Sequence, residues 1–581
     1  MTIEHTKSTA FECEEPAEAL ENAKVTRLAD IESERAPFSI ESSWIYRILP
    51  IFVFILAVVA LSDWQSPEFG RHPDEAAHFI TGTLVHDWVS TGFSSSSVDY
   101  GLHYYTRFPK VALGHWPPVF YGIQGVWYGL FGVSRWSATA LTSTIAVVFL
   151  TLLTGVVRRS VSTPSALLAL ALVISSPVFR YVSTVFMADT LVAVLSLSAI
   201  WCFAIYLERG GLKPILGFGV LSGLAILTKQ DAIVLAVVPP LSVIARRRWD
   251  LLKDWRFYVP ALVVLAICAP YYWFVKGLTH SPWEGMARRP WEQKAEFLLG
   301  GLSLCGPIGW AISLFGFGAA VLAARKSTWS ANILAVLTAH VLGVAAVQMA
   351  TPVSFDPRYK TALIPISAFF AANAFNAVLQ WRYGAPALKL AGLTLLTVAL
   401  IVAQPMNAFR KVTGYRQAVE SLSERTGLQV VMVCSDPQGD GAVTAEFRLQ
   451  HPDGKFVLVR ADKMLAASTW MNQNYRLIYE TPEDVEKYLL RQPVHYVLID
   501  DWGKESGTHH ALLEATLKAR PDRFPLVSEF KIERLIMGFT HTGTAKLYRV
   551  EGNAGQYPSE VELTVSGLPR DGKIKASVGD F

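Results

Sequence analysis

Long apolar runs recur along the middle of this chain and constrain its fold more than any other feature. Between about residues 46 and 404, apolar stretches of roughly 15–25 residues follow one another, which is the length that a helix needs to cross a bilayer. Only 17% of the 581 residues are charged, whereas soluble proteins have about 25%. The pattern therefore predicts a polytopic α-helical membrane protein.

The charged residues gather at the two ends of the chain. Residues 1–45 are polar and contain no recognisable signal peptide, so we expect a disordered cytoplasmic tail. Residues 46–408 form the predicted transmembrane domain, with a first outer loop at 63–136, and residues 409–581 form a separate domain. The net charge of +4 is too small to indicate a nucleic-acid partner. The five cysteines lack the paired spacing of a disulfide framework or a zinc cluster: Cys13, Cys202, Cys268, Cys305 and Cys434.

About eleven spans fit the apolar pattern, and the basic connections between them orient the chain. Lys and Arg accumulate on the cytoplasmic side of membrane proteins. With the N-terminus inside, the basic connections, such as Arg246 to Arg248, are all cytoplasmic if residues 117–133 do not cross. The predicted spans cover residues 46–62, 137–156, 163–178, 188–207, 214–228, 231–245, 257–275, 299–323, 330–350, 360–378 and 386–404.

Residues 117–133 decide this topology. This segment is short and rich in glycine, and it contains Trp and Tyr, which favours an interfacial or re-entrant helix. An ordinary twelfth span is the alternative. Without that span, the polar groups of several loops and everything after residue 405 lie on the outer face of the membrane.

An acidic pair, Asp74–Glu75, lies on this outer face shortly after the first span. Pro73 suits the first turn of a helix, and acidic side chains are favoured there, so helix-start chemistry alone explains the pair. The sequence DEAAH has Asp74 where a zinc protease needs its first histidine, which excludes that class of site. A metal site of His72, Asp74 and His78 stays open, although no spacing rule supports it.

Cations follow in the same loop and at the outer ends of later spans. Arg107, Lys110 and His115 precede a Pro-Pro pair, and such cations suit a lipid phosphate, although snorkelling at the interface is the alternative. Ionisable groups at the edges of spans are costly and usually functional. Those expected at outer span ends are Asp189, Lys229, Arg358 and, beside it, Tyr359.

The last 170 or so residues have the pattern of a soluble domain. Short β-branched runs at 428–436, 495–502 and 543–552 predict strands, and residues 481–492 predict an amphipathic helix with a threonine cap. Strands that alternate with helices predict a small α/β domain. Residues 436–447 lack the full spacing of a nucleotide-binding loop, so we interpret them as a plain strand-to-helix turn.

In their order along the chain, these residues resemble the GT-C class of polyprenyl-phosphate-sugar-dependent glycosyltransferases, such as the bacterial lipid A aminoarabinose transferases, the protein O-mannosyltransferases and transferases acting on rhizobial lipopolysaccharide. The resemblance covers about residues 46–404. One departure is Trp116, which stands where many relatives have Lys or His before the Pro-Pro pair. The motifs that carry the resemblance are Pro73-Asp74-Glu75, Pro117-Pro118 to Gly132, Ala188-Asp189, Gly223-Leu224 with Lys229, and Arg358-Tyr359.

The resemblance implies a function and a set of site residues. A sugar would move from a polyprenyl-phosphate donor to an envelope glycolipid, polysaccharide or protein, outside the bacterial plasma membrane. Inversion by one direct displacement is expected, and no metal or other cofactor is indicated. Asp74 would act as base with Glu75 in support, and Asp189 would be the second acid. The implied substrate-binding and phosphate-binding residues are Arg107, Lys110, His115, Lys229, Arg358 and Tyr359.

Two other function classes remain open from the sequence. A transporter or lipid flippase would usually show repeated halves with broken helices near the midplane, and no such repeat is visible. A non-catalytic subunit could use the C-terminal domain to bind an envelope partner. The sequence names neither the sugar nor the acceptor.

Overall fold

The structure is a computed structural model of the 581-residue chain. Its described residues are 68–111, 114–276, 290–351, 355–403, 411–423, 427–452, 454–467, 475–492, 494–536, 538–552, 560–564 and 573–577. The first predicted span, 46–62, and the N-terminal tail lie outside these residues.

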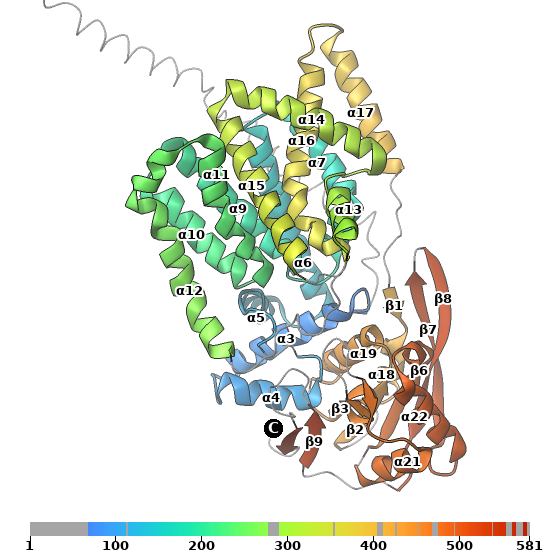
Figure 1. Cartoon of the computed structure of the whole chain (residues 1–581). Coiled ribbons are helices and arrows are strands. Elements are labelled where there is room, and N and C mark those ends of the chain that lie inside the picture. Colours follow the sequence, from blue (N-terminus) through green and yellow to red (C-terminus); the bar gives the residue numbers. More distant parts are fainter. Residues whose placement is uncertain are drawn as a thin grey trace, which may run out of the picture. The chain divides into compact units, whose positions relative to one another are not determined.

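Helices make up most of the described residues between 68 and 403 (Figure 1). Six described helices are long and apolar enough to cross a membrane, and a bent pair brings the number to as many as seven. The six are Arg135–Arg158, Asp189–Arg209, Trp255–Val275, Gly306–Lys326, Thr328–Ala350 and Pro357–Leu379. The pair is Thr163–Ser175 with Pro177–Thr184, bent by 65°. These elements confirm a multi-pass helical fold.

The individual helices from the first loop onward are as follows: α3 (Pro73–Ser90), α4 (Ser97–Arg107), α5 (Val119–Phe131), α6 (Arg135–Arg158), α7 (Thr163–Ser175), α8 (Pro177–Thr184), α9 (Asp189–Arg209), α10 (Leu212–Ile226), η1 (Gln230–Val237), α11 (Val238–Arg246), η2 (Trp249–Lys253), η3 (Trp255–Tyr258), α12 (Val259–Val275), α13 (Trp291–Gly301), α14 (Gly306–Lys326), α15 (Thr328–Ala350), η4 (Pro357–Leu363), α16 (Ile364–Leu379) and α17 (Pro386–Val402).

Several predicted spans are not single helices, and two of them show why. The span at 231–245 divides into the 3₁₀ helix η1 and the short helix α11, and the two prolines at 239 and 240 cannot donate the backbone bonds that would continue an α-helix across them. The span at 299–323 divides into α13 and α14 at Gly306, whose φ of +62° is open to glycine but costly for other residues. Apolar composition alone conceals such breaks.

Helix α5 has 13 residues, too few to cross a bilayer as a straight helix. One face packs against α3, while several large apolar side chains on the rest of its surface are exposed: Ile123, Val126, Leu130 and Phe131. The short length and two-sided character agree with the expected interfacial helix.

Helix α3 lies at the centre of the first loop. Residues 75–84 are buried without interruption, because α3 packs against both α5 and a helix of the C-terminal domain, α19 (Pro437–Gln450). A helix covered on all sides needs small or apolar residues around its whole circumference, and the stretch EAAHFITGTL provides them.

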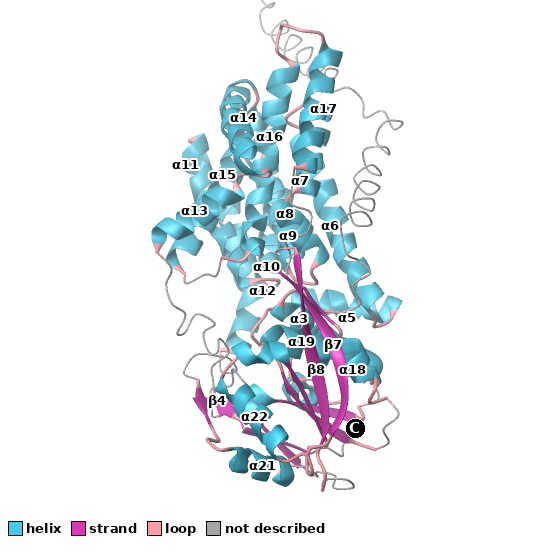
Figure 2. Cartoon of the chain, turned by 90° about the vertical axis from the view of Figure 1, so that its right-hand side faces the viewer, coloured by secondary structure: helices cyan, strands magenta, loops and turns pink. Residues whose placement is uncertain are grey.

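The C-terminal domain is built on a six-stranded sheet (Figure 2). Its order is β1-β7-β8-β6-β2-β3; β2 pairs in parallel with β3 and β6, and the other pairs are antiparallel. Buried aliphatic side chains of the parallel strands form its core with α21 and α22. The sheet strands are β1 (Lys411–Thr413), β2 (Gln429–Cys434), β3 (Phe456–Arg460), β6 (Tyr496–Asp500), β7 (Leu526–Ile536) and β8 (Phe539–Arg549).

The remaining elements of the domain are α18 (Tyr415–Glu420), α20 (Ala461–Met464), α21 (Pro482–Arg491), η5 (Asp501–Glu505), α22 (Thr508–Ala519), β4 (Ala466–Ala467), β5 (Arg476–Leu477), β9 (Glu560–Thr564) and β10 (Lys573–Ser577). The predicted strands and the helix at 481–492 are confirmed, and Thr481 caps α21 by accepting a hydrogen bond from the Asp484 amide. The turn at 436–447 opens α19, with Asp436 as its cap.

The C-terminal domain is tied to the first loop at both ends of α3. Before α3, the buried Glu68 carboxylate accepts hydrogen bonds from three successive amides at the start of α18, residues 414–416. Near its end, Asp87 pairs with Arg448 of α19. Between these ties, Gly441 of α19 lies so close to Ala76 that a Cβ there would be 3.1 Å from the Ala76 Cβ.

Candidate active site

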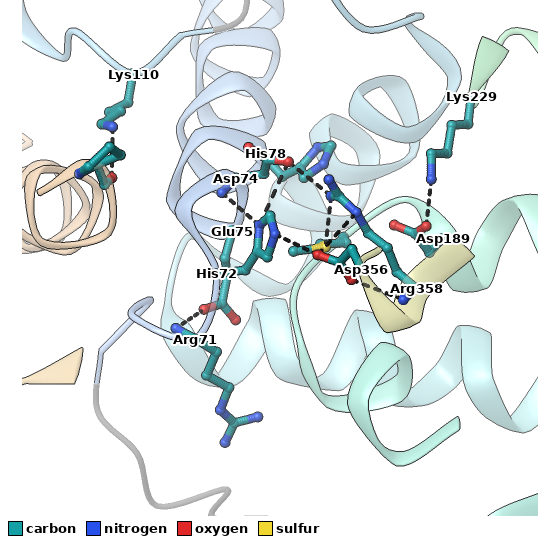
Figure 3. A network of polar contacts seen from close by, with 12 residues as sticks. Arg71, His72, Asp74, Glu75, His78, Lys110, Asp189, Lys229, Asp356 and Arg358 are labelled. Carbon is teal, nitrogen blue, oxygen red and sulfur yellow. Dashed lines mark hydrogen bonds and ion pairs between the residues drawn. The ribbon is translucent and has the colours of Figure 1, made fainter. Parts of the chain in front are cut away.

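The acidic pair lies in the first turn of α3, as helix-start chemistry predicts. Pro73 occupies the first turn, and the side chain of His72 caps the helix: its Nδ1 accepts a hydrogen bond from the Asp74 amide at 3.0 Å. Since Nδ1 accepts, Nε2 of the neutral ring carries the proton and donates to Asp356 Oδ2, 3.0 Å away. His72 thereby joins α3 to the segment before η4 (Figure 3).

Asp74 faces Arg358, which is 284 residues further along the chain. Arg358 Nη1 donates to Asp74 Oδ2 at 2.9 Å. Burial raises the pKa of the Asp74 carboxyl, but the charge of Arg358 and its hydrogen bond to the carboxylate outweigh that effect, and the net pKa lies well below its usual range. Asp74 is therefore an ion-paired carboxylate.

A second ion pair lies beside the first. Lys229 Nζ is 2.6 Å from Oδ1 of the buried Asp189 and 3.4 Å from Asp231 Oδ2. The ammonium also lies 4.7 Å from the ring centre of Tyr359. The structure thus brings together Asp74, Asp189, Lys229 and Arg358 (Figure 3). Tyr359 joins them through its contact with Lys229, so five of the residues predicted from the sequence lie together.

Glu75 points to a different partner from Asp74. Its carboxylate accepts hydrogen bonds from the amides of Arg71 and Phe186, at 2.9 and 3.1 Å. Burial raises the pKa of this carboxyl, and the nearby Arg71 charge and backbone amides oppose that shift. These bonds fix the start of α3 to the segment that leads into α9, so Glu75 acts on the site through the position of α3.

An aromatic group covers α3 one turn after Asp74. His78 stacks on Trp116 with ring centres 4.0 Å apart, and its Nδ1 lies 2.7 Å from the hydroxyl oxygen of Tyr121. Burial lowers the pKa of His78 to about 3, so this imidazole is neutral. Trp116, the departure from the family pattern, therefore packs on the helix of the acidic pair. The His115 carbonyl is 3.5 Å from Gln230 Nε2.

Arg107 and Lys110 are placed elsewhere. Lys110 Nζ donates to the carbonyl oxygen of Pro437 in the C-terminal domain at 2.9 Å, and Arg107 lies against Gly454 of the same domain. Figure 3 shows Lys110 apart from the Asp74–Arg358 pair. These two cations serve the junction between the first loop and the C-terminal domain.

A cavity opens beside the two ion pairs and runs between α9, η1, α15 and η4. Its polar wall includes Asp189, Arg358 and Tyr359, while most of its lining is aliphatic. Arg358 Nε is buried and makes no hydrogen bond in the part of the chain that the structure describes, although it lies 3.7 Å from Asp356 Oδ2. A buried N–H that makes no hydrogen bond can donate to the oxygen of a ligand without losing an existing hydrogen bond.

Sequence reasoning assigned no role to His72 and did not connect it to Asp356. The signal was present in part, because Asp356 precedes Pro357-Arg358 and a histidine precedes Pro73. Their contact joins segments that no local pattern relates. No group of three or more His, Cys, Asp and Glu side chains with metal-binding geometry occurs among the described residues.

Comparisons with known proteins bear on the fold that holds these residues. Residues 115–274 match the family model described as dolichyl-phosphate-mannose-protein mannosyltransferase. No curated protein sequence matches the chain. The crystal structure of ArnT from Cupriavidus metallidurans bound to undecaprenyl phosphate has a TM-score of 0.53 at 12% identity, over 89% of this chain and 100% of that one.

An oligosaccharyltransferase from Archaeoglobus fulgidus in its apo form is also similar, with a TM-score of 0.51 at 13% identity over 80% of this chain and 70% of that one. At these identities the likeness concerns the fold. Together with the apolar spans and the C-terminal sheet, it assigns this chain to the GT-C class of membrane glycosyltransferase folds.

Proposed function

We propose that this chain transfers a sugar from a polyprenyl-phosphate donor to an envelope acceptor, a glycolipid, polysaccharide or protein, at the outer face of the bacterial plasma membrane. The observation that carries the proposal is the pairing of two carboxylates with two cations beside one cavity: the partly buried Asp74 with Arg358, and the buried Asp189 with Lys229. Arg358 and Asp189 line that cavity. The N-terminus would be cytoplasmic and the C-terminal domain outside.

The arrangement suits a single displacement. Asp74 takes the proton of an acceptor hydroxyl, the hydroxyl oxygen forms a bond to the anomeric carbon, and the bond from that carbon to the phosphate oxygen breaks. The electron pair leaves with the lipid phosphate, whose charge Arg358 and Lys229 stabilise in a site with little water. Attack opposite the leaving group inverts the anomeric carbon. We assign no metal to this step.

The ion pair of Asp74 with Arg358 implies that the donor binds before Asp74 acts as a base. A carboxylate that is held by a guanidinium is a weak base, because the charge that lowers its pKa also lowers its affinity for a proton. A donor phosphate that shares Arg358 relieves this effect. Asp74 then becomes a stronger base only when the donor is in place.

Mass spectrometry of envelope glycans and glycolipids tests the proposal in cells with and without the chain. We expect one sugar to be lost without it, and also in cells that carry Asp74→Asn at normal expression. Asp99→Asn is the matched control, since Asp99 lies in the same outer loop but is exposed and bonded only locally to Ser96. Unchanged glycans in both the deletion and the Asp74 variant would refute the proposed function.

A further inference from the structure

The inner part of the cavity contains two polar side chains that no hydrogen bond satisfies. His340, in the middle of α15, is 3% exposed, and Ser196 on α9 is 7% exposed; both line the cavity. Among the residues that the structure describes, neither side chain donates or accepts a hydrogen bond. An ionisable residue inside a membrane span is costly, and its retention points to a ligand or a pathway.

The two groups lie at a similar depth. On α9, the cavity face repeats at residues 189, 192, 193, 196, 197 and 200, which is one side of a helix. Ser196 is seven residues below Asp189, about 10 Å along the axis at 1.5 Å per residue. On α15, His340 is eight residues from Gln348, about 12 Å by the same rise. Both helices therefore present a polar group well below the mouth.

The chemistry of these groups argues against a hydrocarbon occupant. A neutral imidazole and a hydroxyl each donate and accept hydrogen bonds. Covering them with an isoprenoid chain would leave both unpaired, and each unpaired group weakens binding by about tenfold or more. A sugar ring has apolar faces for the aliphatic walls and hydroxyls for the polar groups.

We propose that this cavity holds the sugar of the lipid-linked donor, with His340 and Ser196 hydrogen-bonding its distal hydroxyls and so selecting the sugar. This inference rests on the proposed function for the position of the phosphate, at Arg358 and Lys229. The polyprenyl chain then leaves the mouth toward the lipid instead of filling the cavity. A site that hydrogen-bonds a hydroxyl strongly rejects analogues that lack it.

Binding to the purified full-length chain in detergent tests the assignment. The probes are decaprenyl phosphate alone and decaprenyl phosphate that carries mannose, glucose or arabinose. We expect the wild type to bind at least one glycosylated lipid more tightly than the bare lipid. Ser196→Ala and His340→Phe should each lower the affinity for that glycosylated lipid about tenfold. Both variants should keep an affinity for the bare lipid within about twofold of the wild type. His340→Gln should lose less affinity for the glycosylated lipid than His340→Phe.

Ser198→Ala is the matched control on the same helix, because the Ser198 hydroxyl is already bonded to the Val194 carbonyl at 2.8 Å and does not line the cavity. If the variants lost affinity equally for the bare and the glycosylated lipid, the polyprenyl tail would occupy the cavity, and the inference would be overturned. Unchanged binding in both variants, or no gain from any sugar in the wild type, would also overturn it. Loss of glycan transfer in Asp74→Asn cells is a separate result, so the proposed function can stand while this inference fails.

Discussion

Replacing Arg448 by methionine should loosen α3 from the C-terminal domain. Arg448 Nη2 donates to the two carboxylate oxygens of Asp87 at 3.1 and 2.8 Å, and its Nε donates to the Tyr104 hydroxyl at 2.8 Å. The Arg448 side chain is 8% exposed and that of Asp87 is 25% exposed. One side chain of α19 thus holds the end of α3 and the middle of α4.

The expected cost follows from this partial burial. Removing one partner from a fully buried ion pair costs about 3–5 kcal/mol, because the other charge stays unpaired. Water can reach Asp87 after the change, and methionine fills much of the space of the arginine stem, so we expect about 2 kcal/mol of local stability to be lost. At 1.4 kcal/mol per factor of ten, amide exchange in α3 should accelerate by about 30-fold.

Hydrogen exchange of the full-length chain in detergent, followed by mass spectrometry of α3 peptides, measures this effect. Arg520→Met is the control: Arg520 belongs to the same domain, but its ion pairs with Glu486 and Asp522 are at the surface, and it should leave α3 exchange unchanged. In the double variant with Asp87→Asn, the loss of local stability should be smaller than the sum of the losses in the two single variants. An α3 exchange rate within threefold of the wild type would refute the idea that Arg448 holds this helix.

Three other changes test the same structure. Gly441→Val should lower the midpoint of thermal unfolding by several degrees, since even a Cβ at this position would come within 3.1 Å of α3; an unchanged midpoint would contradict the close packing. Asp356→Ala should reduce sugar transfer by about tenfold at normal expression, because His72 loses its partner across to η4, and a glycan profile equal to wild type would count against this link. Burial raises the pKa of Glu446 to about 7, above the ordinary 4.5, so its protonated form favours the folded state. Thermal stability should therefore fall as pH rises from about 4.5 through 7, and a Glu446→Gln variant that keeps the same pH dependence would assign the effect elsewhere.

Local sequence patterns predict the helices and strands of this fold better than they predict which elements pack together. Apolar runs of bilayer length locate α6, α9 and α15, and the cap at Thr481 locates α21, because these signals lie within each segment. The burial of α3 on all sides has no such signal. Its partners α5 and α19 come from residues 119–131 and 437–450, and only the tertiary structure reveals that both cover it.

The same limit separates the cations of the site. Topology placed Arg358, Lys229, Arg107 and Lys110 on one face of the membrane, but a shared face extends far beyond the reach of one side chain. The structure places Arg358 and Lys229 on carboxylates beside the cavity, and Lys110 on a carbonyl of the C-terminal domain. A rule based on the side of the membrane cannot distinguish these neighbourhoods.

The charge balance of the site leads to a last prediction. Four carboxylates lie beside the two cations of the site. Asp74 and Asp356 lie beside Arg358 (Figure 3), and Asp189 and Asp231 lie beside Lys229. A lipid phosphate that enters this site must share cations that already have partners, so the acids that serve the reaction oppose the binding of the donor phosphate.

Asp74→Asn should therefore separate binding from transfer. Without the Asp74 charge, Arg358 is free to pair with phosphate, and we expect the affinity for bare decaprenyl phosphate to rise by several-fold while sugar transfer is lost. Glu75→Gln is the contrast, because Glu75 accepts only backbone amides and its carboxylate does not pair with Arg358; its affinity for the lipid should stay near that of the wild type. If Asp74→Asn instead bound the lipid more weakly, Arg358 would not be the shared cation, and the donor phosphate would have to lie elsewhere than beside this ion pair.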